Sequence, residues 1–160
     1  MRQGSILVLS PNSVITDFLK KALIKSGDIT VINHLHSAFD YIYNNIPDLL
    51  IMDLQGDSEG IGLLNSLKED PLFAHLSVLV ILGQGDQTPD WETLLVEDYI
   101  WRKDLENDVC MKVDLCFSRS DRMVEVNPLT RMIRLQGEDG RVLEIPSSRM
   151  SRVDGKWRIT

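Results

Sequence analysis

The sequence predicts an α/β fold: a doubly wound, five-stranded parallel sheet with helices on both faces, followed by a C-terminal extension rich in β-hairpins. Two observations predict the sheet. Unbroken apolar runs, typical of strands buried on both faces, recur at residues 6–9, 49–52 and 78–82. Segments with apolar residues at helical spacing separate these runs. A strand–helix order repeated five times, with right-handed crossovers, makes the sheet parallel.

The first strand and the first helix show this pattern most clearly. The run at 6–9 predicts the first and central strand, which ends at Ser10-Pro11-Asn12. Apolar residues at helical spacing then predict a helix over residues 13–25. We expect Ser10 or Asn12 to cap the start of this helix and Gly27 to end it.

The remaining elements of this domain continue the alternation. Apolar and β-branched runs predict strands, and helical spacing predicts the helices between them. In chain order they are a strand at 29–32, a helix around 38–42 that stops before Pro47, a strand at 48–53, a loop at 55–60, a helix around 61–67, a strand at 78–82, a loop at 83–86, a short helix around 91–95, a strand at 99–101 and a helix around 109–117.

Residues 118–160 form a second part with a different pattern. Mixed apolar and polar runs at 123–126, 132–135 and 142–145 predict hairpins, and residues 156–159 are a candidate for one more strand. Because a few short strands bury little surface alone, we expect this extension to pack on the domain of residues 1–117 or on a partner.

The net charge differs between the two parts of the chain, and this difference indicates which kinds of partner each part can bind. Residues 1–116 hold 8 Lys/Arg and 18 Asp/Glu, a net charge of −10, whereas residues 117–160 hold 9 and 6, a net charge of +3. The acidic domain argues against a nucleic-acid surface there. The basic extension permits nucleic-acid binding without requiring it, because its Arg residues alternate with acids.

The remaining composition favours a cytoplasmic protein. The chain shows no signal peptide and no apolar run near the ~20 residues that cross a bilayer. Cys110 and Cys116 lie on different faces of a predicted helix, so we expect reduced thiols and neither a disulfide nor a metal site. His34, His36 and His75 are too scattered to predict a metal site.

Asp53 is the most informative residue of the chain. It follows the apolar run of the third strand, at the carboxyl edge of the predicted sheet, where open α/β sheets bind ligands and perform chemistry. A charged residue ending such a strand marks the point where the strand leaves the core.

Three segments around this residue carry a family resemblance. They are residues 47–54, which contain Asp53, residues 60–68 with Pro71, and residues 97–100. In matching order, they resemble the receiver domain of two-component response regulators (CheY-like) over about residues 4–117. The resemblance implies the flavodoxin-like receiver fold. It also makes Asp53 the phospho-acceptor position, with Mg²⁺ as the cofactor only if Asp53 is phosphorylated.

The rest of the family's phosphorylation site is not matched. The family holds Mg²⁺ with two acids after the first strand, where this chain has Ser10 and Pro11. The hydroxyl that the family places after the fourth strand falls on Leu82 or Gly83. The family's lysine after the fifth strand falls on Arg102, followed by Lys103, and Arg meets phosphate with a different geometry from Lys. The resemblance therefore implies a degenerate pocket.

Asp53 consequently has two interpretations. It is a phospho-acceptor, or it is a solvated remnant at the strand end, paired with Arg102 or Lys103 in a way that imitates part of the active arrangement. Asp57 and Glu59 in the following loop are candidate extra ligands, although a solvated loop is the simpler interpretation.

The partner face and the extension complete the functional predictions. Tyr99 and Trp101 stand where receivers present a partner face, and an aromatic residue there anchors an interface or simply packs. Residues 127–132 are faintly similar to the opening motif of diguanylate cyclases, but that family's catalytic motif is absent. No recognition helix follows the hairpins, so we expect no direct DNA binding.

The sequence thus favours a pseudo-receiver: a protein-interaction module of bacterial two-component signalling that works independently of phosphorylation and is not an enzyme. Its expected partner is a protein, either a histidine kinase or a signalling effector, with a homodimer as a further option and no membrane. The alternative is a working response regulator that accepts phosphate on Asp53. A third alternative is nucleic-acid binding through the basic extension.

Overall fold

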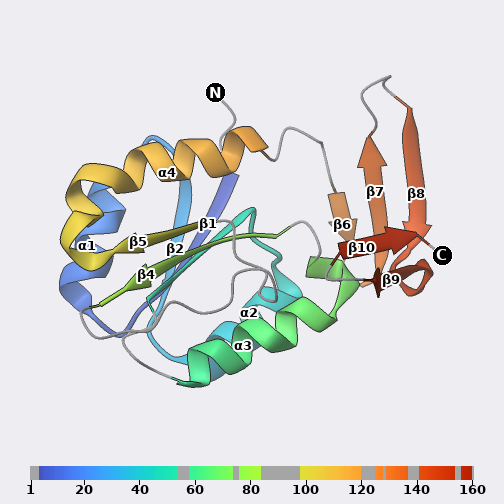
Figure 1. The fold of residues 1–160 in the computed structure, drawn as a ribbon, viewed down its shortest axis with the longest axis horizontal. Helices are drawn as coiled ribbons and strands as arrows, with labels where there is room; N and C mark the ends of the chain where they lie inside the picture. Colours follow the sequence, from blue (N-terminus) through green and yellow to red (C-terminus); the bar gives the residue numbers. More distant parts are fainter. Residues whose placement is uncertain are drawn as a thin grey trace.

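The computed structural model describes residues 4–53, 58–73, 76–83, 98–119, 125–127, 129–136, 141–153 and 156–159. Five parallel strands form one sheet in the order β2-β1-β3-β4-β5. This is the predicted flavodoxin-like receiver fold (Figure 1). The strands of the sheet are β1 (Gly4–Leu9), β2 (Gly27–Ile32), β3 (Leu49–Asp53), β4 (Ser77–Leu82) and β5 (Asp98–Trp101).

Helices cover both faces of the sheet and close two hydrophobic cores. On one face, α1 (Ser13–Ala22) and α4 (Leu105–Arg119) pack against alternate residues of the strands. On the other, α2 (Leu35–Asn44) and α3 (Ser58–Glu69) pack against the intervening residues. Because both faces are covered, β3 and β4 are buried along their whole length, which explains their unbroken apolar sequence.

Some predicted boundaries are wrong. Helix α1 ends at Ala22 instead of residue 25, and Gly27 begins β2 instead of ending the helix. Glycine is required at position 27 by a close approach between strands, because a Cβ there would lie 2.1 Å from the carbonyl oxygen of Gly4 on β1. Strand β1 is an inner strand, but the middle position belongs to β3. Helix α3 begins at Ser58, within the predicted loop.

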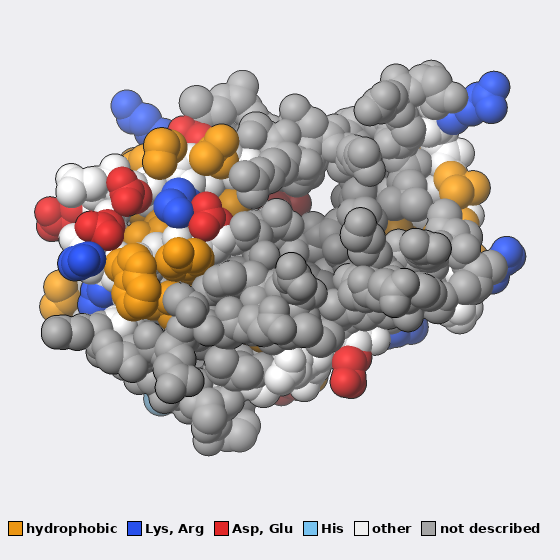
Figure 2. Space-filling view, viewed as in Figure 1, with side chains coloured by type: hydrophobic (Ala, Val, Ile, Leu, Met, Phe, Trp, Pro, Cys, Tyr) orange, Lys and Arg blue, Asp and Glu red, His pale blue; other side chains and the backbone are white. Residues whose placement is uncertain are grey.

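The extension forms two small antiparallel sheets. The predicted hairpins appear as a three-stranded sheet of β6 (Glu125–Asn127), β7 (Met132–Gln136) and β8 (Val142–Pro146). The candidate last strand, β10 (Lys156–Ile159), pairs with β9 (Met150–Val153), which the sequence pattern did not predict. On the face shown in Figure 2, acidic, basic and hydrophobic side chains are mixed around α4 and β5, and further Lys and Arg side chains stand at the end formed by the extension.

The extension packs on the α/β domain, which was one of the two predicted outcomes. Ile133 of β7 and Ile145 of β8 are buried in the same core cluster as α2, α3 and the 3₁₀ helix η1 (Pro71–Phe73). Beside this contact, Arg131 Nη2 donates to Asp70 Oδ1 at 2.9 Å. The backbone of Arg131 is left-handed, with φ 58°, a conformation that costs a non-glycine residue about 1 kcal/mol or more. The structure therefore holds a strained residue at the junction of its two parts.

Tyr43 of α2 adds to this junction. Burial, followed by the charge and hydrogen bond of Asp70, raises the pKa of the Tyr43 phenol above its ordinary value. Its ring also makes an edge-to-face contact with Phe73 of η1, with ring centroids 5.1 Å apart. Tyr43 and Asp70 thus link α2 to the segment that holds the extension.

Several predicted features lie outside the described residues: the loop at 84–86, the helix around 91–95, Asp57 and His75. The side chains of His36 and Glu59 also lie outside them. None of the described helices is long and apolar enough to span a membrane.

Candidate functional site: a closed carboxylate at the edge of the sheet

The sheet order brings the predicted site residues to one edge. Strands β1, β3 and β4 are neighbours, and they end at Leu9, Asp53 and Leu82. Ser10 and Gly83 therefore follow two strands that flank Asp53, and Arg102 begins the 3₁₀ helix η2 (Arg102–Asp104) directly after β5. The carboxyl ends of the parallel strands, where such sheets place their functional sites, therefore hold four of the predicted site residues: Ser10, Asp53, Gly83 and Arg102.

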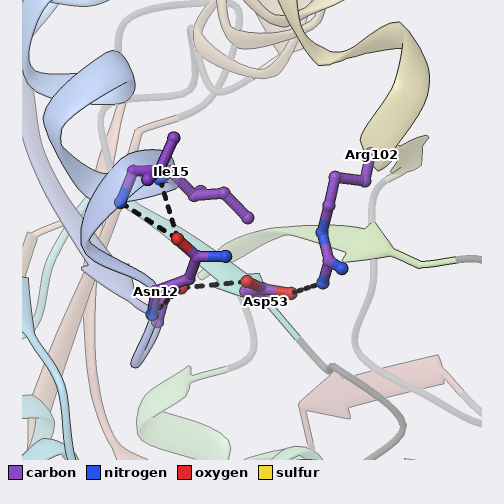
Figure 3. Close-up of polar contacts among 6 residues, drawn as sticks. Asn12, Ile15, Asp53 and Arg102 are labelled. Carbon is purple, nitrogen blue, oxygen red and sulfur yellow. Dashed lines mark hydrogen bonds and ion pairs between the residues drawn. The ribbon is translucent and has the colours of Figure 1, made fainter.

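Ser10 holds one oxygen of the Asp53 carboxylate. Its hydroxyl donates to Asp53 Oδ2 at 2.9 Å and accepts the Asn12 N–H at 3.1 Å. Asn12 in turn caps α1, because its Oδ1 accepts the N–H groups of Val14 and Ile15 at 3.0 and 3.3 Å (Figure 3). Both Ser10 and Asp53 are buried, so the hydrogen bond between them is shielded from water.

Arg102 holds the other oxygen. Its Nη2 donates to Asp53 Oδ1 at 2.9 Å, and Figure 3 shows the two side chains pointing toward each other across the edge of the sheet. The Asp53 side chain is 0% exposed and that of Arg102 is 38% exposed. The expectation of a solvated acid at this strand end is therefore wrong: β3 is covered on both faces up to its last residue.

Gly83 makes room for the guanidinium of Arg102. A Cβ at position 83 would lie 3.1 Å from Arg102 Nη1 and 3.4 Å from Cζ, closer than ordinary van der Waals contact for the first atom. A threonine or serine, which the resemblance places after the fourth strand, would crowd the guanidinium. The glycine and the arginine thus fit each other.

The described residues of the pocket do not fit a Mg²⁺ ion. Magnesium requires octahedral oxygen ligands, chiefly carboxylates and water. Asp53 is the one acid in the described part of the pocket, and its two oxygens already accept hydrogen bonds from Ser10 and Arg102. No group of three His, Cys, Asp or Glu residues that could hold a metal ion occurs among the described residues. The positive guanidinium beside Asp53 further disfavours a divalent cation.

The other predicted pocket positions lie differently. Leu82 is fully buried in the core with α2 and α3, so Gly83 is the position that faces the site. Pro11 and Lys103 are exposed, and the ion pair with Asp53 is made by Arg102. His34 precedes α2 and is exposed. Cys116 is buried, and Cys110 is exposed, with its Sγ 3.5 Å from the carbonyl oxygen of Ala22.

Tyr99 and Trp101 are partly buried and pack against the core of α2 and α3. Their rings make an edge-to-face contact with centroids 6.2 Å apart. Lys112 of α4 holds this strand, because its Nζ donates to Asp98 Oδ2 at 3.1 Å and to the Tyr99 carbonyl at 2.9 Å. The sequence did not single out Lys112, because only the fold brings it to Asp98, 14 residues earlier in the chain.

Comparison with solved structures identifies the fold. The receiver domain of the Francisella response regulator 1452 matches with a TM-score of 0.64 and 20% identity, over 74% of this chain and 100% of that one. The receiver domain of a histidine kinase from Syntrophus aciditrophicus matches with a TM-score of 0.64 and 19% identity, over 78% and 97%. The chain has the receiver fold. A response regulator from Thermotoga maritima has it too, with a TM-score of 0.58 and 18% identity, over 73% and 99%.

Sequence comparison adds no further relative. No protein-family model and no curated protein matches the chain. The receiver fold is therefore shared at low sequence identity, and the residues of the pocket have to be judged by their own geometry.

Proposed function

We propose that the chain is a pseudo-receiver: a protein-interaction module of two-component signalling whose working state does not depend on phosphorylation. The observation that carries this proposal is the ion pair between Arg102 and Asp53, joined by the hydrogen bond from Ser10. We infer a binding role in the cytoplasm, without catalysis.

Each oxygen of the Asp53 carboxylate already accepts a hydrogen bond, one from Ser10 and the other from Arg102. To accept a phosphoryl group, a carboxylate oxygen must approach phosphorus in line with the leaving group, while nearby cations neutralise the charge on the phosphoryl oxygens. Here that approach requires breaking a buried hydrogen bond or a charge-assisted one. Because the described residues of the pocket also offer no ligand set that fits Mg²⁺, the proposal is that Asp53 has a structural role.

The closed pocket would fix the surface that meets partners. Arg102 follows β5 directly, so its ion pair with Asp53 anchors the end of the strand that carries Tyr99 and Trp101. A receiver that responds to phosphate must shift such elements between two arrangements, whereas an internal ion pair holds one. We propose the surface of α4 and β5 as the partner face, with a histidine kinase, a signalling effector or a second copy as the partner.

A phosphodonor assay tests this proposal. The purified chain is incubated with acetyl phosphate and Mg²⁺, and its intact mass is measured. We expect no phosphoryl adduct, while a receiver with a complete acid pair, treated in parallel, gains one. An adduct on this chain that disappears in the Asp53→Asn variant would overturn the proposal and establish the phospho-acceptor alternative.

A further inference from the structure

Strand β5 is an outer strand of the parallel sheet, and α4 packs beside it (Figure 1). Within the described residues, β4 is the only strand that pairs with β5. An outer strand offers its backbone N–H and C=O groups to any extended chain that can add to the sheet. The side chains that reach this edge therefore decide whether it is open or closed.

Asp98 and Lys112 engage both backbone groups of Tyr99. The Tyr99 N–H donates to Asp98 Oδ1 at 2.8 Å, and the Tyr99 carbonyl oxygen accepts a hydrogen bond from Lys112 Nζ at 2.9 Å. Lys112 Nζ also donates to Asp98 Oδ2 at 3.1 Å, which completes a ring of hydrogen bonds around one residue. The N–H and C=O of one strand residue point to the same side, so the two groups engaged here are those that face away from β4.

The same ammonium contacts the Tyr99 ring. Lys112 Nζ lies 5.6 Å from the centroid of this ring, within the range of a cation–π interaction. The ring also meets that of Trp101 edge to face. Asp98 and Lys112 are both partly buried, so water screens their charges less than those of a fully exposed pair. The backbone and the ring of Tyr99 are therefore held by one group.

Strand β5 is thus held at both of its ends. The ring of hydrogen bonds holds its first two residues, Asp98 and Tyr99. The ion pair between Arg102 and Asp53 holds the chain directly after its last residue. The two contacts share no side chain, so each can be removed by substitution without removing the other.

We propose that Asp98 and Lys112 are positioning residues of the partner face: they close the outer edge of β5 at Tyr99 and hold the Tyr99 ring in one orientation. A partner then binds this position through side-chain contacts, because the backbone groups that strand addition needs are already engaged. The inference rests on the proposed function only in taking the surface of α4 and β5 as the partner face.

Amide hydrogen exchange of the chain, measured residue by residue by NMR, tests the closed edge. We expect the Tyr99 amide to exchange at least about tenfold more slowly than in an unstructured peptide, because Asp98 accepts its hydrogen bond. Asp98→Ala should raise this rate at least about tenfold and leave the amide of Ile51, in the middle of the sheet, unchanged. A freely exchanging Tyr99 amide in the wild type would overturn the inference. So would a variant that accelerates neither amide, or both equally, because the edge contact would then have no local effect.

Nuclear Overhauser effects between the Tyr99 and Trp101 rings test the hold on the ring. The wild type should show them for one ring orientation, since the two rings are in edge-to-face contact. Lys112→Met removes the ammonium and keeps an unbranched side chain, and it should lose most of their intensity. The control Lys20→Met, at an exposed lysine of α1, should keep them. Full intensity in a folded Lys112→Met variant, with folding shown by circular dichroism, would contradict a positioning role for Lys112.

The outcome is separable from that of the phosphodonor assay. A protected Tyr99 amide and a fixed Tyr99 ring, in a chain that also takes phosphate on Asp53, would leave the inference standing and overturn the proposed function. A freely exchanging Tyr99 amide in a chain that takes no phosphate would do the opposite.

Discussion

Gly83 and Arg102 act as a pair at the edge of the sheet. The guanidinium reaches Asp53 Oδ1 while its Nη1 lies in the space that a side chain at position 83 would need. The Arg102 Nε–H is buried and finds no hydrogen-bond partner among the described residues, which lowers the stability gained from this arrangement. The interaction therefore depends on the missing side chain at position 83 as much as on the two charges.

A double-mutant cycle measures this dependence. Arg102→Ala leaves a buried carboxylate without its cation and should lower the free energy of unfolding by about 1–3 kcal/mol. Gly83→Thr should displace the guanidinium, so Arg102→Ala should cost clearly less in the Gly83→Thr background. Urea unfolding of the four proteins gives the coupling energy. Additive costs would show that Gly83 does not position Arg102.

Part of this site was predictable from the sequence. The position of Asp53 followed from the apolar run before it, and Arg102 was one of two candidate cations. The choice between Arg102 and Lys103 was not predictable, because it depends on how the chain turns from β5 into η2. The role of Gly83 was missed. A glycine at this position indicates only that the hydroxyl expected after the fourth strand is missing, and it does not indicate that the Arg102 guanidinium occupies the space of that side chain.

The raised pKa of the Tyr43 phenol should make the free energy of unfolding depend on pH. Folding raises the pKa of its phenol above the ordinary 10.0, so the unfolded chain loses this proton at lower pH than the folded one. The free energy of unfolding should therefore fall as pH rises from about 10 toward the folded-state pKa. Urea unfolding of wild type and of Tyr43→Phe, at several pH values from about 8 upward, isolates this contribution. Equal slopes with pH in the two proteins would contradict the prediction.

At the scale of elements, the strands follow the sequence pattern more closely than the helix ends do. Because β1, β3 and β4 are buried on both faces, each contains an unbroken run of apolar residues that the sequence shows directly. The end of α1 at Ala22 leaves no such pattern, and Gly27, which the pattern offered as its end, is instead required by the close approach to Gly4 in the neighbouring strand. The sequence did not predict β9, because residues 150–153 show no alternating apolar pattern. Its antiparallel pairing with β10 appears only in the structure.

The Asn12 cap at the start of α1 can be tested directly. Asn12→Ala removes the cap of α1 and should lower the free energy of unfolding by about 1 kcal/mol, whereas Asn12→Asp should keep most of it. Urea denaturation followed by circular dichroism provides the measurement. If Asn12→Ala and Asn12→Asp were equally destabilised, the cap would contribute nothing measurable.

At the scale of the molecule, the receiver-like domain and the extension share one core. The sequence predicted that the extension packs on the domain or on a partner, and the burial of Ile133 and Ile145 shows the first outcome. The sequence alone could not locate the contact. The apolar residues of the hairpins predict strands with a buried face, but they do not indicate whether the domain or a partner covers that face.

Ile133→Ala tests the shared core. Removing this buried side chain should lower the free energy of unfolding by about 2–5 kcal/mol, and fluorescence and circular dichroism should still report one common transition. Leu129→Ala, at a residue that is 91% exposed in the same extension, is the matched control and should change the free energy by less than about 0.5 kcal/mol. Two separate transitions in the wild type would show that the parts unfold independently.

The shared core also affects how the protein is made. Ribosomes deliver the receiver-like domain before the extension, so the apolar surface that Ile133 and Ile145 cover faces water until β7 and β8 emerge. During that interval the nascent chain offers a site for chaperones or for aggregation. A fragment cut at residue 117 would keep that surface open permanently, so a chain that includes residues 118–160 is the appropriate form for expression.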